Sequence, residues 1–267
     1  MSLTHAALWV TGVTLAFLWL ATLAVSLRES AARDLFVQFM CQVAAYSLGL
    51  FALLRLYAPD TSIRQFLAFR RTHVGFYALA LCLGVALVLP ANVLFELSHW
   101  LFPQLDRPTD VTTLFYAAST RDRWLMGFAI GLAGPIIEEV LFRGALFGPL
   151  LRTHRPLTVM LGTGAYFALV HLDPHTMVPI FIVGSLLGYL RVASGSIVPA
   201  VIMHAAFNGV PLVTMVLGDK PSAPSGALDI PILATVLCVL ASVGLGFAIH
   251  YLGRRSAQAR VARSRDG

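Results

Sequence analysis

Long apolar segments alternate with short polar segments along almost the whole chain. Eight of them are apolar enough to cross a bilayer, and most approach the roughly 20 residues that a spanning helix needs. To within a few residues they cover 6–27, 35–57, 74–95, 124–150, 157–172, 176–193, 196–217 and 229–252, of which the fifth and sixth are short. The pattern predicts an all-α polytopic membrane protein with about eight transmembrane helices, forming a single transmembrane domain over residues 1–267.

The polar segments indicate an orientation. No Lys or Arg precedes the first apolar run, which is long enough to span, so we expect a first transmembrane helix there and no cleaved signal peptide. An even number of spans puts both ends on one side. Placing them in the cytoplasm puts most arginines there, as the positive-inside rule requires. We therefore expect a multi-pass protein of the cell inner membrane with cytoplasmic termini and a basic cytoplasmic tail at 253–267.

The segment 96–123 is too polar to span. Its early part carries Trp100, Leu101 and Phe102 beside Pro103. One interpretation is an interfacial helix followed by a loop, which could gate access to the bundle. The other is a surface connector without a role in chemistry.

Composition supports the membrane assignment. The chain is 58% hydrophobic and only 12% charged, whereas soluble domains carry about 25% charged residues. The net charge of +6 does not predict nucleic-acid binding, because the basic residues gather in loops and the tail. The three cysteines lie far apart in apolar runs and form no CxxC pattern. Arginine is used almost exclusively, Lys220 being the one lysine, which suggests a high-GC bacterial source.

Two adjacent carboxylates, Glu138 and Glu139, interrupt an apolar stretch. A charge within hydrocarbon costs about 2.5–3.5 kcal/mol even on insertion scales, so such residues usually carry function. On a helix, Glu139 shares a face with Arg143 four residues later and can pair with it, whereas Glu138 points elsewhere. This predicts a structural ion pair and a second carboxylate free to face a polar cavity, near a kink at Pro135. The alternative is a charge cluster that only locks two helices together.

Three further polar residues lie in apolar spans. His171 follows Phe167 by four residues on the same face, and His204 and Asn208 are also four apart. The last two could donate hydrogen bonds to one point, as an oxyanion hole does. They could equally be metal ligands or an interhelical clamp, and His171 could be a packing residue. With the predicted topology, Glu138 and both histidines lie near mid-membrane and can meet in one cavity.

A nucleophilic side chain is missing from this set. No GxSxG elbow, HExxH motif or reactive cysteine beside a base is visible in the sequence. A water molecule activated by Glu138 is therefore the simplest nucleophile.

The motifs EEVLFR at 138–143, FALVH at 167–171 and HAAFN at 204–208 together resemble those of the CPBP family. This family contains type II CAAX prenyl endopeptidases and bacterial Abi-type proteins, with motifs EExxxR, FxxxH and Hxxx(N/D) on successive transmembrane helices. The resemblance covers about residues 120–215, the expected catalytic core. It implies an intramembrane endopeptidase of eight helices with its active site in the bundle core.

The resemblance also implies roles. Glu138 and His171 would activate water, His204 and Asn208 would stabilise the tetrahedral intermediate, and Glu139 and Arg143 would position the base. No cofactor is required by this residue set. A divalent metal such as zinc is the alternative, with Glu138, His171 and His204 as candidate ligands.

The expected partners are the lipid bilayer and a membrane protein or peptide substrate. Cleavage could process a CAAX-type end, a leader or a C-terminal anchor, and many bacteria lack prenylated substrates. A different class of function is a non-proteolytic transporter or a bacteriocin-immunity membrane protein, in which the same polar residues bind ions or a peptide.

Overall fold

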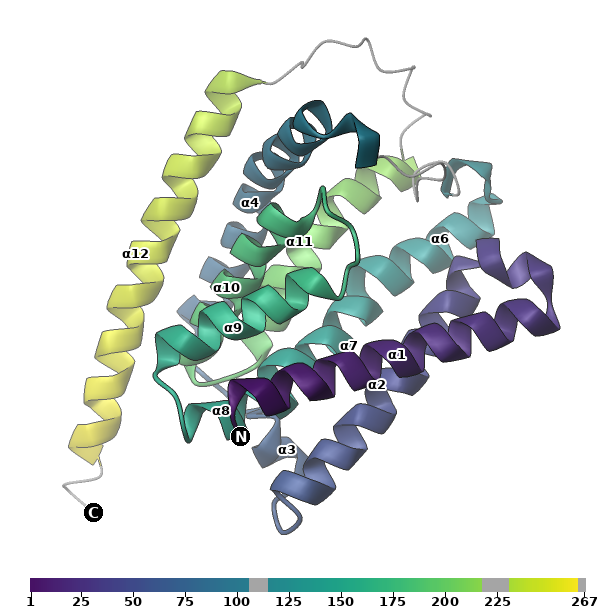
Figure 1. Ribbon diagram of the computed structural model, residues 1–267. Coiled ribbons are helices and arrows are strands. Elements are labelled where there is room, and N and C mark those ends of the chain that lie inside the picture. The colour runs from purple at the N-terminus through teal and green to yellow at the C-terminus, as the bar shows by residue number, and fades with distance from the viewer. Residues whose placement is uncertain (106–114, 218–230, 264–267) are drawn as a thin grey trace.

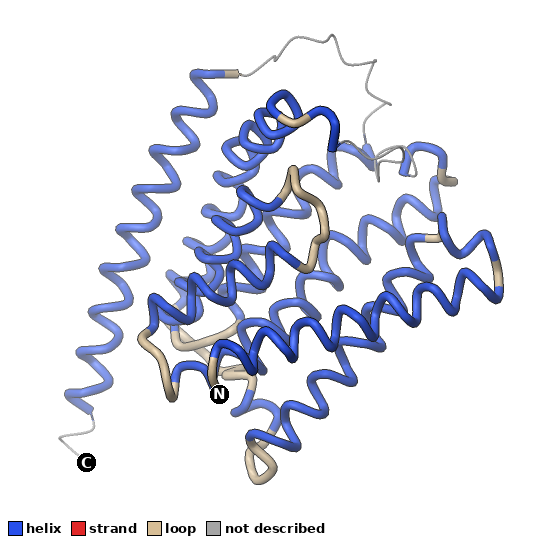
Figure 2. The backbone as a smooth tube through the Cα atoms, viewed as in Figure 1, coloured by secondary structure: helices blue, strands red, loops and turns tan. Residues whose placement is uncertain are grey.

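The computed structural model describes residues 1–105, 115–217 and 231–263, and these residues form helices and no strands (Figure 2). Seven helical segments are long and apolar enough to cross a membrane. They are α1 (Leu3–Leu27), α2 (Leu35–Tyr57), α4 (Val74–Leu101), the continuous segment Thr120–Leu151, α10 (Met177–Ser194), α11 (Val198–Leu217) and α12 (Ile232–Arg263) (Figure 1). The predicted all-α polytopic fold is confirmed. Of the eight expected spans, the fifth is the shorter apolar helix α9 (Pro156–Leu169).

The remaining described elements are short. They are the 3₁₀ turns η1 (Glu29–Arg33) and η2 (Pro103–Leu105) and the helix α3 (Ile63–Phe66). Trp100 and Leu101 end α4 and form no separate interfacial helix, because the helical pattern simply continues past residue 95. Residues 106–114 lie outside the described residues. The predicted tail is helical as far as Arg263, where α12 ends, and residues 264–267 are not described.

Several helix ends follow from local sequence. The side chains of Asp34, Ser62 and Ser119 accept hydrogen bonds from backbone N–H groups in the first turns of α2, α3 and α6 (Thr120–Phe128). α9 begins with a proline, whose missing N–H is unneeded in a first turn. Gly195 ends α10 with φ of 70°, in the left-handed region that glycine adopts without strain. These local signals place the turns between the helices that carry the polar residues.

The described helices pack around α10 and α11. α9 packs against α10, and α4 packs against both α11 and α12, which lies along one edge of the bundle (Figure 1). Small residues permit the closest approaches. A Cβ at Gly84 of α4 would clash with the main-chain oxygen of Met203 in α11. Gly184 of α10 allows a second close approach, since a Cβ there would lie 3.1 Å from the Cα of Gly164 in α9.

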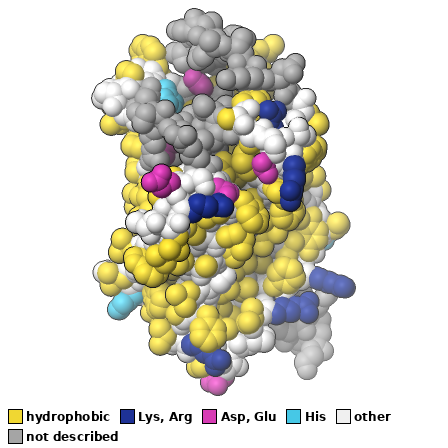
Figure 3. All heavy atoms as spheres, turned by 90° about the vertical axis from the view of Figure 1, so that its right-hand side faces the viewer, with side chains coloured by type: hydrophobic (Ala, Val, Ile, Leu, Met, Phe, Trp, Pro, Cys, Tyr) yellow, Lys and Arg dark blue, Asp and Glu magenta, His cyan; other side chains and the backbone are white. Residues whose placement is uncertain are grey.

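The outer surface is that of a multi-pass membrane protein. Hydrophobic side chains cover much of the face in Figure 3, and arginine side chains lie toward its upper and lower parts. The N-terminus lies at one end of the bundle, where the terminal ammonium donates to the main-chain oxygen of Pro149 at 3.4 Å. α12 ends on the same side (Figure 1). The described chain therefore begins and ends at the same end of the bundle.

Candidate active site

The site is built on an irregular helix. Within Thr120–Leu151, three α-helical pieces alternate with two π-helical turns: α6 (Thr120–Phe128), η3 (Ala129–Ala133), α7 (Gly134–Glu139), η4 (Val140–Leu146) and α8 (Phe147–Leu151). π turns are rare and are frequent at functional sites. Both carboxylates of the predicted site lie at the end of α7, between the two π turns.

Pro135 accounts for one of these irregularities. In η3 the N–H of Gly134 donates to the carbonyl of Ala129, five residues earlier. In the same register, the carbonyl of Ile130 would require the N–H that Pro135 lacks. The side-chain amide of Asn208 donates to this carbonyl instead, at 3.1 Å. The proline expected to kink the helix therefore exposes a carbonyl that positions Asn208 of α11.

The predicted ion pair between Glu139 and Arg143 is confirmed. Arg143 Nη1 donates to Glu139 Oε1 at 2.8 Å, and both side chains are fully buried. Arg143 Nη2 donates to the main-chain oxygen of Gly184 in α10 at 2.7 Å. The guanidinium also lies 4.6 Å from the centre of the Phe167 ring. Arg143 is thus committed to Glu139 and to α10, and does not pair with Glu138.

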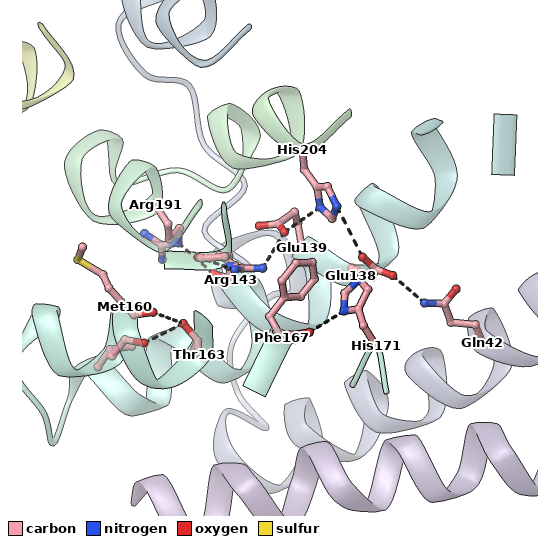
Figure 4. A network of polar contacts seen from close by, with 12 residues as sticks. Gln42, Glu138, Glu139, Arg143, Met160, Thr163, Phe167, His171, Arg191 and His204 are labelled. Atoms are coloured by element: carbon pink, nitrogen blue, oxygen red, sulfur yellow. Dashed lines mark hydrogen bonds and ion pairs between the residues drawn. The ribbon is translucent and has the colours of Figure 1, made fainter. Parts of the chain in front are cut away.

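Glu138 has a different environment (Figure 4). Its Oε1 accepts a hydrogen bond from Gln42 Nε2 of α2 at 2.8 Å, and 15% of its side chain is exposed. Its Oε2 lies 3.7 Å from His204 Nε2 of α11. His204 Nδ1 lies 3.1 Å from Glu139 Oε1. His204 therefore stands between the two carboxylates and holds its ring by donating through Nδ1 to the buried one.

His171 comes from the turn after α9. Its Nδ1 lies 2.7 Å from the main-chain oxygen of Phe167. A carbonyl only accepts, so Nδ1 carries the proton and Nε2 keeps its lone pair in the neutral ring. The ring of Phe167 meets His171 and His204 edge to face, at centroid distances of 4.9 and 5.4 Å. Phe167 thus spaces the two imidazoles and covers the buried guanidinium.

The side chains of Glu138, His171 and Asn208 border one cavity of about 500 Å³. Two glutamines of α2, Gln38 and Gln42, also line it. Apolar residues from α1, α10 and α11 form another part of the wall: Phe17, Ile180, Phe207, Pro211 and Leu212. Residues of α2 and of the segment 129–135 complete it. The cavity is large enough for a short peptide segment and offers acid, base and amide groups along one side. Glu138, His171 and Asn208 thus reach one cavity from three parts of the chain, whereas His204, also expected there, is buried and does not line it.

The site residues do not form a metal centre in this arrangement. Among the residues that the structure describes, no three His, Cys, Asp or Glu side chains are grouped so that they could hold one metal ion. Glu138, His171 and His204 are zinc ligands by type, but their arrangement does not fit a shared ion.

Two features were not predicted. Gln42 and Gln38 are four residues apart in an otherwise apolar helix, and this spacing could have suggested a polar face toward the site. His204 was expected to act beside Asn208, yet its Nδ1 is engaged by Glu139. His175, near His171 in the sequence, lies away from the cavity. Its ring stacks on His99 at 3.8 Å and contacts Ser98.

Comparison with known proteins identifies the segment that carries these residues. The model of a family described as type II CAAX prenyl endopeptidase Rce1-like matches residues 120–210, which include all three motifs. The expected resemblance is confirmed over this part of the chain. The match supports a CAAX-type intramembrane protease at the level of the family. No curated protein and no solved structure matches the chain.

Proposed function

We propose that this protein, whose residues 120–210 match the type II CAAX prenyl endopeptidase family, is an intramembrane endopeptidase that uses Glu138 as its general base. The position of Glu138 supports this proposal most strongly. Its carboxylate borders a polar cavity, is oriented by Gln42, and has no arginine partner among the described residues. A carboxylate required only for helix packing would be paired, as Glu139 is.

The first step would be attack of water on the peptide carbonyl. Glu138 and the free Nε2 of His171 would hold the water, and Glu138 would accept its proton as the oxygen bonds to the carbonyl carbon. The carbon–nitrogen bond of the tetrahedral intermediate then breaks. The proton passes from Glu138 to the departing amine, so that one water is consumed and two peptide ends are released.

Asn208 and His204 would stabilise the negative charge on the carbonyl oxygen. The Asn208 amide uses one N–H for Ile130, which leaves its second N–H for the oxyanion. His204 can donate through Nε2 when that atom is also protonated, and the imidazolium would then lie between two carboxylates. No step is assigned to a metal, because the candidate ligands are not grouped around a common point.

The substrate would be a membrane protein or membrane-associated peptide. The basic C-terminal tail favours cytoplasmic termini, and the cavity lies between spanning helices. We propose processing of a leader or C-terminal anchor in a bacterial inner membrane, in preference to a prenylated CAAX end.

Comparative proteomics of membranes containing wild type or Glu138→Gln tests the activity and can identify the substrate. The variant should accumulate one uncut precursor, with cleavage reduced by at least about 10²-fold, as is typical on loss of a general base. Glu96→Gln makes the same chemical change at an exposed position near the end of α4 and should cleave normally. Full cleavage by a folded Glu138→Gln protein would exclude this mechanism, whereas coupled uptake in proteoliposomes without any proteolysis would favour transport.

A further inference from the structure

Arg191 is a second buried arginine that the proposed chemistry does not use. It lies in the last turn of α10 and is 8% exposed. Its Nε donates to the main-chain oxygen of Arg143 at 3.1 Å, and its guanidinium lies 5.7 Å from the Phe147 ring centre. In Figure 4 it lies on the side of Arg143 that faces away from the glutamates. Arg191 is therefore close to the site but separate from the cavity.

Within the described part of the chain, no carboxylate forms an ion pair with Arg191. The ion pairs found there involve Arg28, Arg143 and His204. The nearby charge is that of Arg70, which repels Arg191. Nor do Nη1 and Nη2 of Arg191 donate to any described residue, since Nε makes its one hydrogen bond. Among the described residues, Arg191 therefore has a like charge near it and no carboxylate paired with it.

The local energetics favour an external anion. Burial of an ion is costly even after relaxation. The carboxyl end of α10 and one hydrogen bond to a carbonyl offset only part of this cost. An isolated arginine at this position is therefore poorly compensated. A bidentate anion would fit the two unused nitrogens of its planar fork.

Hydrogen bonds hold Arg70 beside this helix end. The hydroxyl of Ser196 donates to the main-chain oxygen of Arg70 at 2.6 Å, and that of Thr72 donates to the main-chain oxygen of Ser194 at 3.0 Å. Arg191 is three residues from the end of α10, or about 5 Å along the helix axis. This is the depth at which phospholipid headgroups meet a spanning helix, and basic pockets between helices bind them there.

We infer that Arg191 and Arg70 bind a phosphate group, carried by a membrane phospholipid or present as free phosphate. The buried guanidinium would supply the bidentate contact, and the exposed one a second charge. The bound anion would also fix Arg191, whose Nε holds the main chain of η4 at Arg143. The site is independent of peptide hydrolysis and would exist in a catalytically inactive variant.

Thermal unfolding of the full-length protein in maltoside micelles tests this site. The probes are dioctanoyl phosphatidylglycerol, inorganic phosphate, and dioctanoylglycerol, which has the same chains without phosphate. Phosphatidylglycerol should raise the unfolding midpoint of the wild type in a saturable manner, and dioctanoylglycerol should not. An equal response to inorganic phosphate would identify a free-anion site, and a response to the lipid alone would identify a headgroup site.

Arginine variants make the test specific. Half-saturation should require about tenfold more ligand in Arg70→Gln, as expected for loss of one charged contact, and Arg191→Gln should lose the response. Arg70 is exposed, so its variant remains informative if Arg191→Gln does not fold. Arg155→Gln, at the exposed start of α9, is the matched control and should respond as the wild type does. Equal shifts with both lipids, or a wild-type response in Arg70→Gln, would overturn the site.

Discussion

Replacing each glutamate of the pair by glutamine should separate stability from activity. Glu139→Gln leaves the fully buried Arg143 cation without its carboxylate. Loss of one partner from a buried ion pair costs about 3–5 kcal/mol. Glu138→Gln removes a charge that is partly exposed and whose hydrogen-bond partner is neutral. A glutamine oxygen can still accept from Gln42, so the cost should stay below about 1.5 kcal/mol, the upper range for one hydrogen bond.

The measurement is the free energy of unfolding of purified protein in mixed micelles, titrated with a denaturing detergent and followed by helical circular dichroism. Arg143→Met should be as destabilising as Glu139→Gln, because it leaves a buried carboxylate. The double variant Glu139→Gln with Arg143→Met removes both charges. It should be more stable than the sum of the single changes predicts, by an interaction energy of about 0.5–3 kcal/mol.

Two results would refute this reasoning. Equal destabilisation by Glu138→Gln and Glu139→Gln would mean that the carboxylates share one structural role. Strict additivity of Glu139→Gln and Arg143→Met would mean that the 2.8 Å contact contributes little to folding. Peptide cleavage is measured separately from unfolding, because Glu138→Gln should fold but should not cleave the substrate.

Three further changes test the surroundings of the base. Asn208→Ala should lower kcat about 10²–10³-fold with a small change in KM, because it removes an oxyanion donor; an unchanged kcat would exclude that role. Gln42→Glu should reduce cleavage more than Gln42→Ala, since a like charge would face Glu138 across a 2.8 Å contact; the reverse order would contradict the assigned contact. Gly84→Ala should cost about 1–3 kcal/mol by overpacking α4 against α11, whereas Gly12→Ala, which meets open space, should cost nothing in the same unfolding assay.

Local spacing along the sequence predicted the parts of this site that depend on one helix or one motif. The four-residue interval between Glu139 and Arg143 gave the ion pair, and the apolar runs gave the spanning helices. Gln42 was not predicted as a site residue because its role depends on α2 lying beside α7. Its partner Glu138 is 96 residues away in the sequence. The π turns escaped because the register of a helix is settled by its tertiary contacts, as the bond from Asn208 to Ile130 illustrates.

The two carboxylates differ because Arg143 pairs with only one of them. Its Nη1 donates to Glu139 and its Nη2 donates to the carbonyl of Gly184, and it forms no ion pair with Glu138. Glu139 in turn engages His204 Nδ1 and so turns Nε2 of that ring toward Glu138. The buried pair therefore does more than lock helices. The charges of Glu139 and Arg143 cancel, and this pair leaves Glu138 at the edge of a polar cavity with lone pairs that can accept a proton. A general base needs such lone pairs to take a proton from water.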